Sequence, residues 1–144
     1  MSAPVEVPVE VAAQAGVAIP DGFEVVCRLD QVRREAGVAA LVGGEAVAVF
    51  RTFDDQVYAL SNFDPFGKAS VLSRGIVGTK TRAPEPGSGA GEEQVPFVAS
   101  PLLKQPFDLR TGACLDDPAV VVPTYQVRVV GGFVLVGPRR TIEP

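Results

Sequence analysis

The sequence predicts an all-β protein: an antiparallel β-sandwich or small barrel with one short helix and a long flexible insertion. Short β-rich segments recur at close intervals, and two pairs of them are joined by Gly-Gly, at residues 43–44 and 131–132. Adjacent glycines supply the positive φ angles that a two-residue hairpin turn needs. A helical pattern appears in only one place, at residues 29–36.

The first part of the chain predicts strands on either side of this helical segment. Residues 23–28 have the composition of a first strand. Asp30 can cap the segment 29–36, whose apolar residues fall on one side, and Gly37 ends it. Three consecutive strands then predict an antiparallel meander; they are residues 38–42, 46–53 and 56–61.

The second part alternates loops with strands. Residues 62–68 are predicted to form a loop, and the pattern of residues 71–77 fits no single element. Residues 78–96 contain three prolines and four glycines, so we predict a long flexible insertion at residues 79–94. The remaining predicted strands are residues 97–100, 105–109, 124–130 and 133–136.

A single domain accounts for most of the chain, because 144 residues suit one hydrophobic core. Residues 1–20 contain three prolines and no clear period, which indicates a flexible N-terminal arm. Residues 21–138 form the predicted domain, and residues 139–144 form a short tail.

The lack of histidine excludes several kinds of catalytic site. The chain has no His and only two Cys, Cys27 and Cys114, which lie 87 positions apart. A structural zinc site needs about four Cys or His ligands in closely spaced pairs. Ser–His–Asp and Cys–His nucleophiles need an imidazole base. We therefore interpret both cysteines as small hydrophobic residues of a reduced protein, and only Lys, Asp, Glu and Tyr remain as acids or bases.

The charge balance argues against nucleic acid and membrane partners. The formal net charge is −4, with 13 Lys and Arg against 17 Asp and Glu, so the chain lacks a basic footprint for phosphate binding. The sequence contains no run of about 18 apolar residues, so it predicts no membrane-spanning helix. The N-terminal segment lacks the positive start and apolar centre of a signal peptide. We therefore expect a cytoplasmic protein.

Two stretches of the sequence resemble a Rieske domain. Residues 107–112 read Phe-Asp-Leu-Arg-Thr-Gly, and the resemblance implies that Phe107 fills the core and that Gly112 closes a turn. Residues 58–64 read Tyr-Ala-Leu-Ser-Asn-Phe-Asp, which is similar to the stretch that ends in the first Cys-x-His ligand pair. The resemblance covers residues 23–137 and implies a Rieske-like fold.

The four positions that bind the iron–sulfur cluster in Rieske domains carry other residues in this chain. A Rieske [2Fe-2S] cluster is held by two Cys on one iron and two His on the other. The matching positions here are Asn62, Asp64, Ser100 and Leu103. None of them is a thiolate or an imidazole, and no histidine elsewhere can substitute. We therefore predict a retained fold with no cluster, metal or other cofactor.

Two longer segments make the resemblance more specific. Residues 62–78 and 98–117 are similar to segments of the small subunit of assimilatory NAD(P)H-dependent nitrite reductase, a Rieske-like family without cluster ligands. The stretch between them is longer than is usual in that family. The resemblance implies a large-subunit partner that carries FAD, a [4Fe-4S] cluster and sirohaem and reduces nitrite to ammonia in nitrate assimilation. This chain would then have no catalytic residues and would stabilise or position the large subunit.

The two altered ligand loops are the predicted partner interface. In a Rieske domain these loops form an exposed tip that docks on a redox partner. Here the tip combines apolar side chains with a charged rim, which suits a protein interface. The predicted interface residues are Pro65, Phe66, Lys68, Arg74, Leu102 and Lys104. The alternative is that Phe63, Leu102 or Leu103 fills the space left by the missing cluster.

Two other functions stay open on the sequence alone. One is a free-standing Rieske-like β-sandwich adaptor for a different protein partner. The other is an electron-carrying Rieske ferredoxin, which shares the fold but needs the ligands that this chain lacks. The glycine-rich residues 86–91 follow no strand and precede no helix, so we interpret them as a loop and not as a phosphate cradle.

Overall fold

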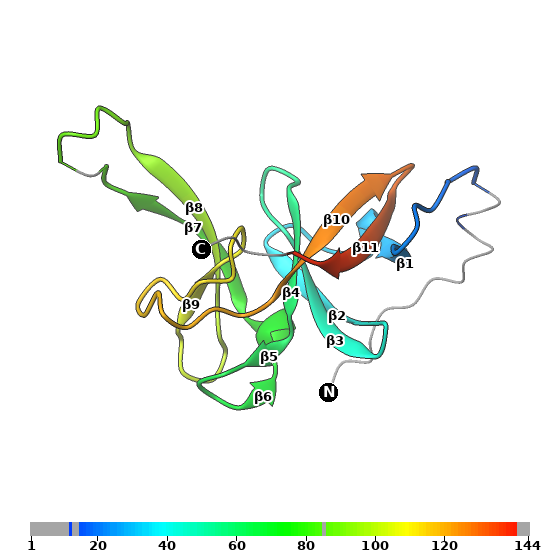
Figure 1. Ribbon diagram of the computed structural model, residues 1–144, viewed down its shortest axis with the longest axis horizontal. Coiled ribbons are helices and arrows are strands. Elements are labelled where there is room, and N and C mark those ends of the chain that lie inside the picture. Colours follow the sequence, from blue (N-terminus) through cyan, green and yellow to red (C-terminus); the bar gives the residue numbers. More distant parts are fainter. Residues whose placement is uncertain (1–11, 13–14, 85, 141–144) are drawn as a thin grey trace.

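The computed structural model describes residues 12, 15–84 and 86–140, and the regular structure within them consists of β-strands and short helical turns (Figure 1). Six strands form one antiparallel sheet in the order β1-β11-β10-β4-β3-β2. Their bounds are β1 Glu24–Arg28, β2 Ala36–Val42, β3 Glu45–Arg51, β4 Val57–Ser61, β10 Thr124–Val130 and β11 Phe133–Arg139. The predicted all-β class is confirmed.

Two smaller sheets complete the fold. The strands β7 (Ile76–Arg82), β8 (Glu93–Ala99) and β9 (Pro106–Asp108) form a three-stranded sheet, whose β7–β8 hairpin projects from the body (Figure 1). The short strands β5 (Phe63–Asp64) and β6 (Ala69–Ser70) form a two-stranded hairpin. Within the described part of the chain, no helix is long and apolar enough to cross a membrane.

The predicted meander and both Gly-Gly hairpins are confirmed. Strands β2, β3 and β4 are neighbours in the large sheet and pair in sequence. The turn glycines between β2 and β3 have φ angles of 56° and 82°, and those between β10 and β11 have φ angles of 58° and 83°. Two consecutive positive φ angles are the geometry of a tight hairpin turn that matches the twist of its strands.

The Phe-Asp-Leu-Arg-Thr-Gly motif has the structural role that the resemblance implied. Phe107 is fully buried. Gly112 has a φ angle of 82°, and a Cβ atom added to it would lie 2.1 Å from the carbonyl oxygen of Val122. Only glycine combines this backbone conformation with so close an approach of the neighbouring chain. The motif is therefore set by packing and turn geometry.

Strand β3 separates two hydrophobic cores. Successive side chains of a strand point to opposite faces, so Val47 and Val49 enter one core while Ala48 and Phe50 enter the other. The first core is formed mainly by side chains of the large sheet itself. The second lies between this sheet and the three-stranded sheet and includes Phe107. Burial on both faces explains why β3 is a nearly continuous apolar run.

The helix predicted at residues 29–36 is present but shorter than predicted. Only η1 (Leu29–Gln31) is helical, as a single 3₁₀ turn. Ala36 already belongs to β2 and pairs with Arg51 of β3, and the Arg51 guanidinium donates hydrogen bonds to the carbonyl groups of Leu29 and Val32 at 3.3 and 3.0 Å. Strand pairing and this anchor hold the segment in place, which a local helical pattern does not reveal.

The last residues of the predicted N-terminal arm belong to the first core. Val17 is buried, and its Cγ2 atom would lie 3.1 Å from a Cβ atom added to Gly131 in the β10–β11 turn. Ile19 also packs against this core. Val17 and Ile19 therefore pack against the predicted domain. Residues 1–11 and 13–14 of the predicted arm, and residues 141–144 of the predicted tail, lie outside the described residues.

Strands β7 and β8 extend into both ends of the predicted insertion. Their ladder continues to the pair Arg82 and Glu93, so that only residues 83–92 remain as the connecting loop. Glu93 also forms an ion pair with Arg110 at 2.8 Å, which links the hairpin to the turn after β9. Because the partner strand satisfies the backbone of residues 79–82, their polar composition was a poor guide to structure.

We predict that residues 83–92 can be replaced by Asn-Gly without loss of the fold. Arg82 and Glu93 are already paired, so a two-residue turn can close the hairpin. Loop-closure entropy changes by only about 0.6 kcal/mol per doubling of loop length, so the free energy of unfolding should change by roughly 1 kcal/mol. Thermal unfolding followed by circular dichroism measures this. Loss of a cooperative transition would show that the loop is packed structure.

Candidate docking surface at the two loops

Two loops lie side by side at one end of the molecule (Figure 1). The first spans residues 62–70 and contains the β5–β6 hairpin, and the second connects β8 to β9. We call residues 63–68 and 100–104 together the tip. The two halves of the tip touch, because a Cβ atom added to Gly67 would lie only 2.5 Å from Cδ1 of Leu102.

The two halves of the tip have the same local architecture. The Lys68 N–H donates to the Asp64 carbonyl at 2.7 Å, and the Lys104 N–H donates to the Ser100 carbonyl at 3.1 Å. Each half is thus a five-residue turn with proline in its second position and lysine in its last. Both lysines adopt left-handed backbone conformations, with φ angles of 56° and 66°. Such angles are unfavourable for a residue with a Cβ atom, and glycine would relieve them.

A buried hydrogen bond joins the two halves at two of the lost ligand positions. The hydroxyl group of Ser100 donates to a carboxylate oxygen of Asp64, 36 residues away in sequence. Both residues are fully buried. The Asp64 carboxylate also accepts the Phe66 N–H at 2.9 Å, and the Ser100 hydroxyl oxygen accepts the Leu102 N–H at 3.2 Å. This pair therefore links the loops from inside.

The other two ligand positions have different roles. Asn62 is buried, and its side chain donates to the Ser70 carbonyl at 3.2 Å and accepts the Ser73 N–H at 2.7 Å. It braces the chain that leads out of the first loop. Leu103 is 57% exposed and points away from the interior. Two loop positions are thus tied across the tip, one is tied locally, and one faces solvent.

The tip does not fit the [2Fe-2S] cluster of a Rieske domain. A carboxamide, a carboxylate, a hydroxyl group and a leucine stand where two thiolates and two imidazoles are needed. The hydrogen bond between Asp64 and Ser100 closes the space between two of these positions. Within the described chain, no group of three or more His, Cys, Asp or Glu side chains converges as metal ligands would.

The surface of the tip is apolar at its centre and positively charged at its rim. Phe63, Leu102 and Leu103 are 45%, 48% and 57% exposed, so they do not fill the space of the missing cluster. The exposed charged side chains of the tip are both cationic, Lys68 and Lys104, and Arg74 follows the first loop in the sequence and is also exposed. Asp64, the only carboxylate of the tip, is buried. This segregation of charge is notable in a chain with a net charge of −4.

The predicted interface residues divide into exposed and partly buried ones. Lys68, Arg74, Leu102 and Lys104 are exposed. Pro65 and Phe66 are partly buried, and Phe66 packs against the second core with its ring centroid 6.1 Å from that of Phe107. The structure therefore gives Phe66 a packing role that the sequence prediction did not assign to it.

Sequence reasoning missed the pairing of Asp64 with Ser100, and it left open whether Phe63 and Leu103 are exposed or fill the space of the cluster. A signal was present, because residues 64–68 and 100–104 share the pattern of a capping oxygen, Pro, two further residues and Lys. Side-chain oxygens that accept a backbone N–H two residues later are typical of tight turns. The repeated pattern indicated two equivalent turns, but not that the turns would meet.

Comparison with known proteins assigns the class of this fold. A family model described as a Rieske-like [2Fe-2S] domain matches residues 22–137. The solution structure of a nitrite reductase [NAD(P)H] small subunit from Erwinia carotovora superimposes with a TM-score of 0.63 at 41% identity, covering 85% of this chain and 86% of that one. The protein is a Rieske-like domain, as its sequence predicted.

The sequence relatives narrow this class. The nitrite reductase (NADH) small subunit of Escherichia coli K12 is 43% identical over 110 residues, which are 76% of this chain and 91% of that protein. The chain belongs to this family of nitrite reductase small subunits. A nitrite reductase [NAD(P)H] large subunit of Klebsiella oxytoca is 41% identical over 127 residues, which are 88% of this chain but only 12% of that protein.

Proposed function

We propose that this chain is the non-catalytic small subunit of a cytoplasmic NAD(P)H-dependent nitrite reductase. It would support a large subunit that holds FAD, a [4Fe-4S] cluster and sirohaem and reduces nitrite to ammonia. The chain belongs to the small-subunit family. The observation that carries the proposal is the hydrogen bond in its tip between Asp64 and Ser100, two residues at former ligand positions. A loop pair held by its own hydrogen bond keeps its shape without a cluster.

The Klebsiella oxytoca relative supports a close association with the large subunit. In that protein a segment similar to this chain lies within a polypeptide named as the large subunit. Two modules in one polypeptide meet at a high effective concentration, which favours an interface between them. A separate small subunit needs a docking surface of its own to reach the same arrangement.

We assign this docking to the tip. The rim would consist of Lys68, Arg74 and Lys104, and the apolar centre would include Leu102 with Pro65 and Phe66 at its base. Phe63 and Leu103 join this surface because of their exposure. An apolar centre inside a charged rim is typical of protein interfaces, and the matching surface of the large subunit would be acidic around an apolar patch.

The adaptor alternative uses the same surface with a different partner. It is favoured only if this chain changes neither the activity nor the stability of the large subunit. The Rieske ferredoxin alternative needs a cluster, which the residues at the ligand positions do not fit. Membership of the small-subunit family favours the first proposal over both.

Reconstitution tests the proposed function. The purified chain should contain no stoichiometric iron or acid-labile sulfide and should not oxidise NADH with nitrite. When it is added to the purified large subunit, nitrite-dependent NADH oxidation or the thermal stability of that subunit should rise. A Rieske ferredoxin of similar size serves as the control protein and should have no effect.

Two results would contradict the proposal. About two irons per chain together with Rieske-type visible absorption would mean that a cluster binds despite the ligand set. A large subunit that is fully active and equally stable without this chain would leave the adaptor function as the better explanation.

A further inference from the structure

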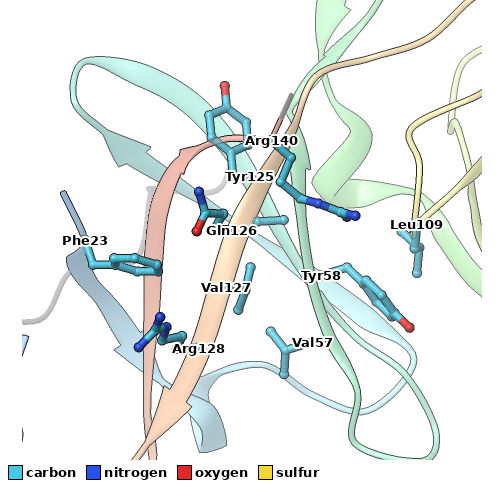
Figure 2. Close-up of a pocket in the computed structure, with 10 residues that line it drawn as sticks. Phe23, Val57, Tyr58, Leu109, Tyr125, Gln126, Val127, Arg128 and Arg140 are labelled. Carbon is cyan, nitrogen blue, oxygen red and sulfur yellow. The ribbon is translucent and has the colours of Figure 1, made fainter. Parts of the chain in front are cut away.

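Strands β4 and β10 are neighbours in the large sheet, but they pair over only two positions. Thr124 pairs with Leu60 and Tyr125 with Ala59, and the strands then separate. The groove between them has a volume of about 340 Å³ and is lined by Val57 and Tyr58 on one side and by residues 126–128 on the other (Figure 2). Among the described residues, the segment 126–130, which we call the open edge of β10, therefore has a strand partner on one side only.

The backbone of the open edge directs alternate hydrogen-bonding groups into this groove. The Thr124 carbonyl accepts the Arg140 N–H on the β11 side, whereas the Pro123 carbonyl accepts the Ser61 N–H on the β4 side. The register shift between β10 and β11 places its extra residue in β11, so β10 keeps a regular alternation. The N–H and C=O groups of Val127 and Val129 thus face the groove, and those of Arg128 and Val130 face β11.

Two side chains of the open edge are also exposed, whereas that of Val127 packs against the first core. Val129 is 43% exposed and Val130 is 38% exposed, although consecutive residues of a strand point to opposite faces. As far as the structure describes the chain, both faces and one edge of the strand end at Val129 and Val130 are therefore open. Natural proteins protect such edges with charged side chains, proline or a bulge in the edge strand, and of these the open edge contains only one charged residue, Arg128. A strand end left in this state is suited to accept another strand.

The charge of the open edge selects the kind of strand. Arg128 is its one charged residue, and its guanidinium lies over the Phe23 ring at 5.1 Å (Figure 2). Within the described chain Arg128 forms no ion pair. Antiparallel pairing of two copies, centred on the open edge, would set Arg128 opposite Arg128, and like charges in that position destabilise a sheet. An acidic residue opposite Arg128 stabilises it, so a partner of different sequence fits better than a second copy.

We propose that the open edge of β10 binds an extended acidic segment of the large subunit as an additional strand. This inference rests on the proposed function and adds to it a second contact, separate from the tip. Backbone hydrogen bonds to Val127 and Val129 supply affinity, and a carboxylate opposite Arg128 with apolar residues against Val129 and Val130 supplies specificity.

Substitution of Val129 tests the proposal with the full chain and the purified large subunit. Val129→Pro removes an N–H that faces the groove and no hydrogen bond to β11, so the isolated chain should still fold. Losing one such hydrogen bond should raise the Kd for the large subunit about tenfold. Val129→Ile keeps both the apolar β-branched side chain and the N–H, and it is the matched control. Arg128→Glu should weaken binding most at low salt, because it reverses the selecting charge.

Amide hydrogen exchange gives a second readout that does not depend on a variant. In the isolated chain the amides of Val127 and Val129 should exchange fast, while those of Arg128 and Val130 should be protected by β11. In the complex all four should be protected. If the chain binds the large subunit but Val127 and Val129 still exchange fast, or if Val129→Pro folds and binds like the parent, the open edge is not the contact and the proposed function stands. If the chain does not bind the large subunit at all, both proposals fail.

Discussion

Replacing Ser100 with alanine is expected to lower the free energy of unfolding by about 2 kcal/mol, because a buried carboxylate loses its hydroxyl donor. Asp64 is fully buried and keeps only the Phe66 N–H as a donor from the tip. The Leu102 N–H also loses its acceptor in this variant. Since the bond joins residues 36 positions apart, its loss also frees the two loops from each other. Urea denaturation measures the change, with the slope m expected to stay constant.

The fourth ligand position provides the matched control for this prediction. Leu103 is exposed, so Leu103→Ala should change the free energy of unfolding by no more than about 0.5 kcal/mol. Asp64→Ala removes the acceptor of both Ser100 and Phe66 and leaves a gap, so it should cost more than Ser100→Ala. If Ser100→Ala unfolds at the same urea concentration as the parent, the two loops are held by packing alone and the internal link has no energetic role.

The double variant Lys68→Gly, Lys104→Gly is expected to bind the large subunit at least about tenfold more weakly while unfolding no more easily than the parent. Loss of even one interaction with a charged group, worth about 1.5 kcal/mol or more, raises a Kd about tenfold. Stability should hold because both lysines have positive φ angles, which glycine adopts without strain. The effect of the glycines on the stability of the fold and the effect of the lost charges on binding are thus seen in different measurements.

Binding measured by biolayer interferometry at two salt concentrations, together with thermal unfolding, separates the two effects. The binding defect should shrink at high salt, because screening reduces the advantage of the parent's charges. Lys80→Gly is a useful comparison, since Lys80 is an exposed lysine on β7 outside the tip and should leave binding unchanged. Equal binding of the double variant and the parent would exclude the lysines of the tip from the interface.

Features that depend on neighbouring residues were predictable from the sequence. The two Gly-Gly hairpins, the turn at Gly112 and the three-strand meander follow from backbone geometry that each short segment imposes by itself. The identity of the four ligand positions is also a local property, because no packing turns an asparagine or a leucine into a thiolate. The sequence by itself therefore determined the all-β class and the poor fit of the tip to a [2Fe-2S] cluster.

Features that depend on distant residues were decided only by the tertiary structure. The helical pattern at residues 29–36 gave way because pairing of Ala36 with Arg51 outweighs a weak local preference. The hydrogen bond between Asp64 and Ser100 and the contact of Val17 with the β10–β11 turn join residues that are far apart in the sequence. No periodic pattern in the sequence predicts such contacts. The open edge of β10 likewise arises from the divergence of two strands that lie far apart in the sequence. A strand's alternation specifies which side of it is buried, whereas its partner and the point where pairing stops depend on how the whole sheet closes.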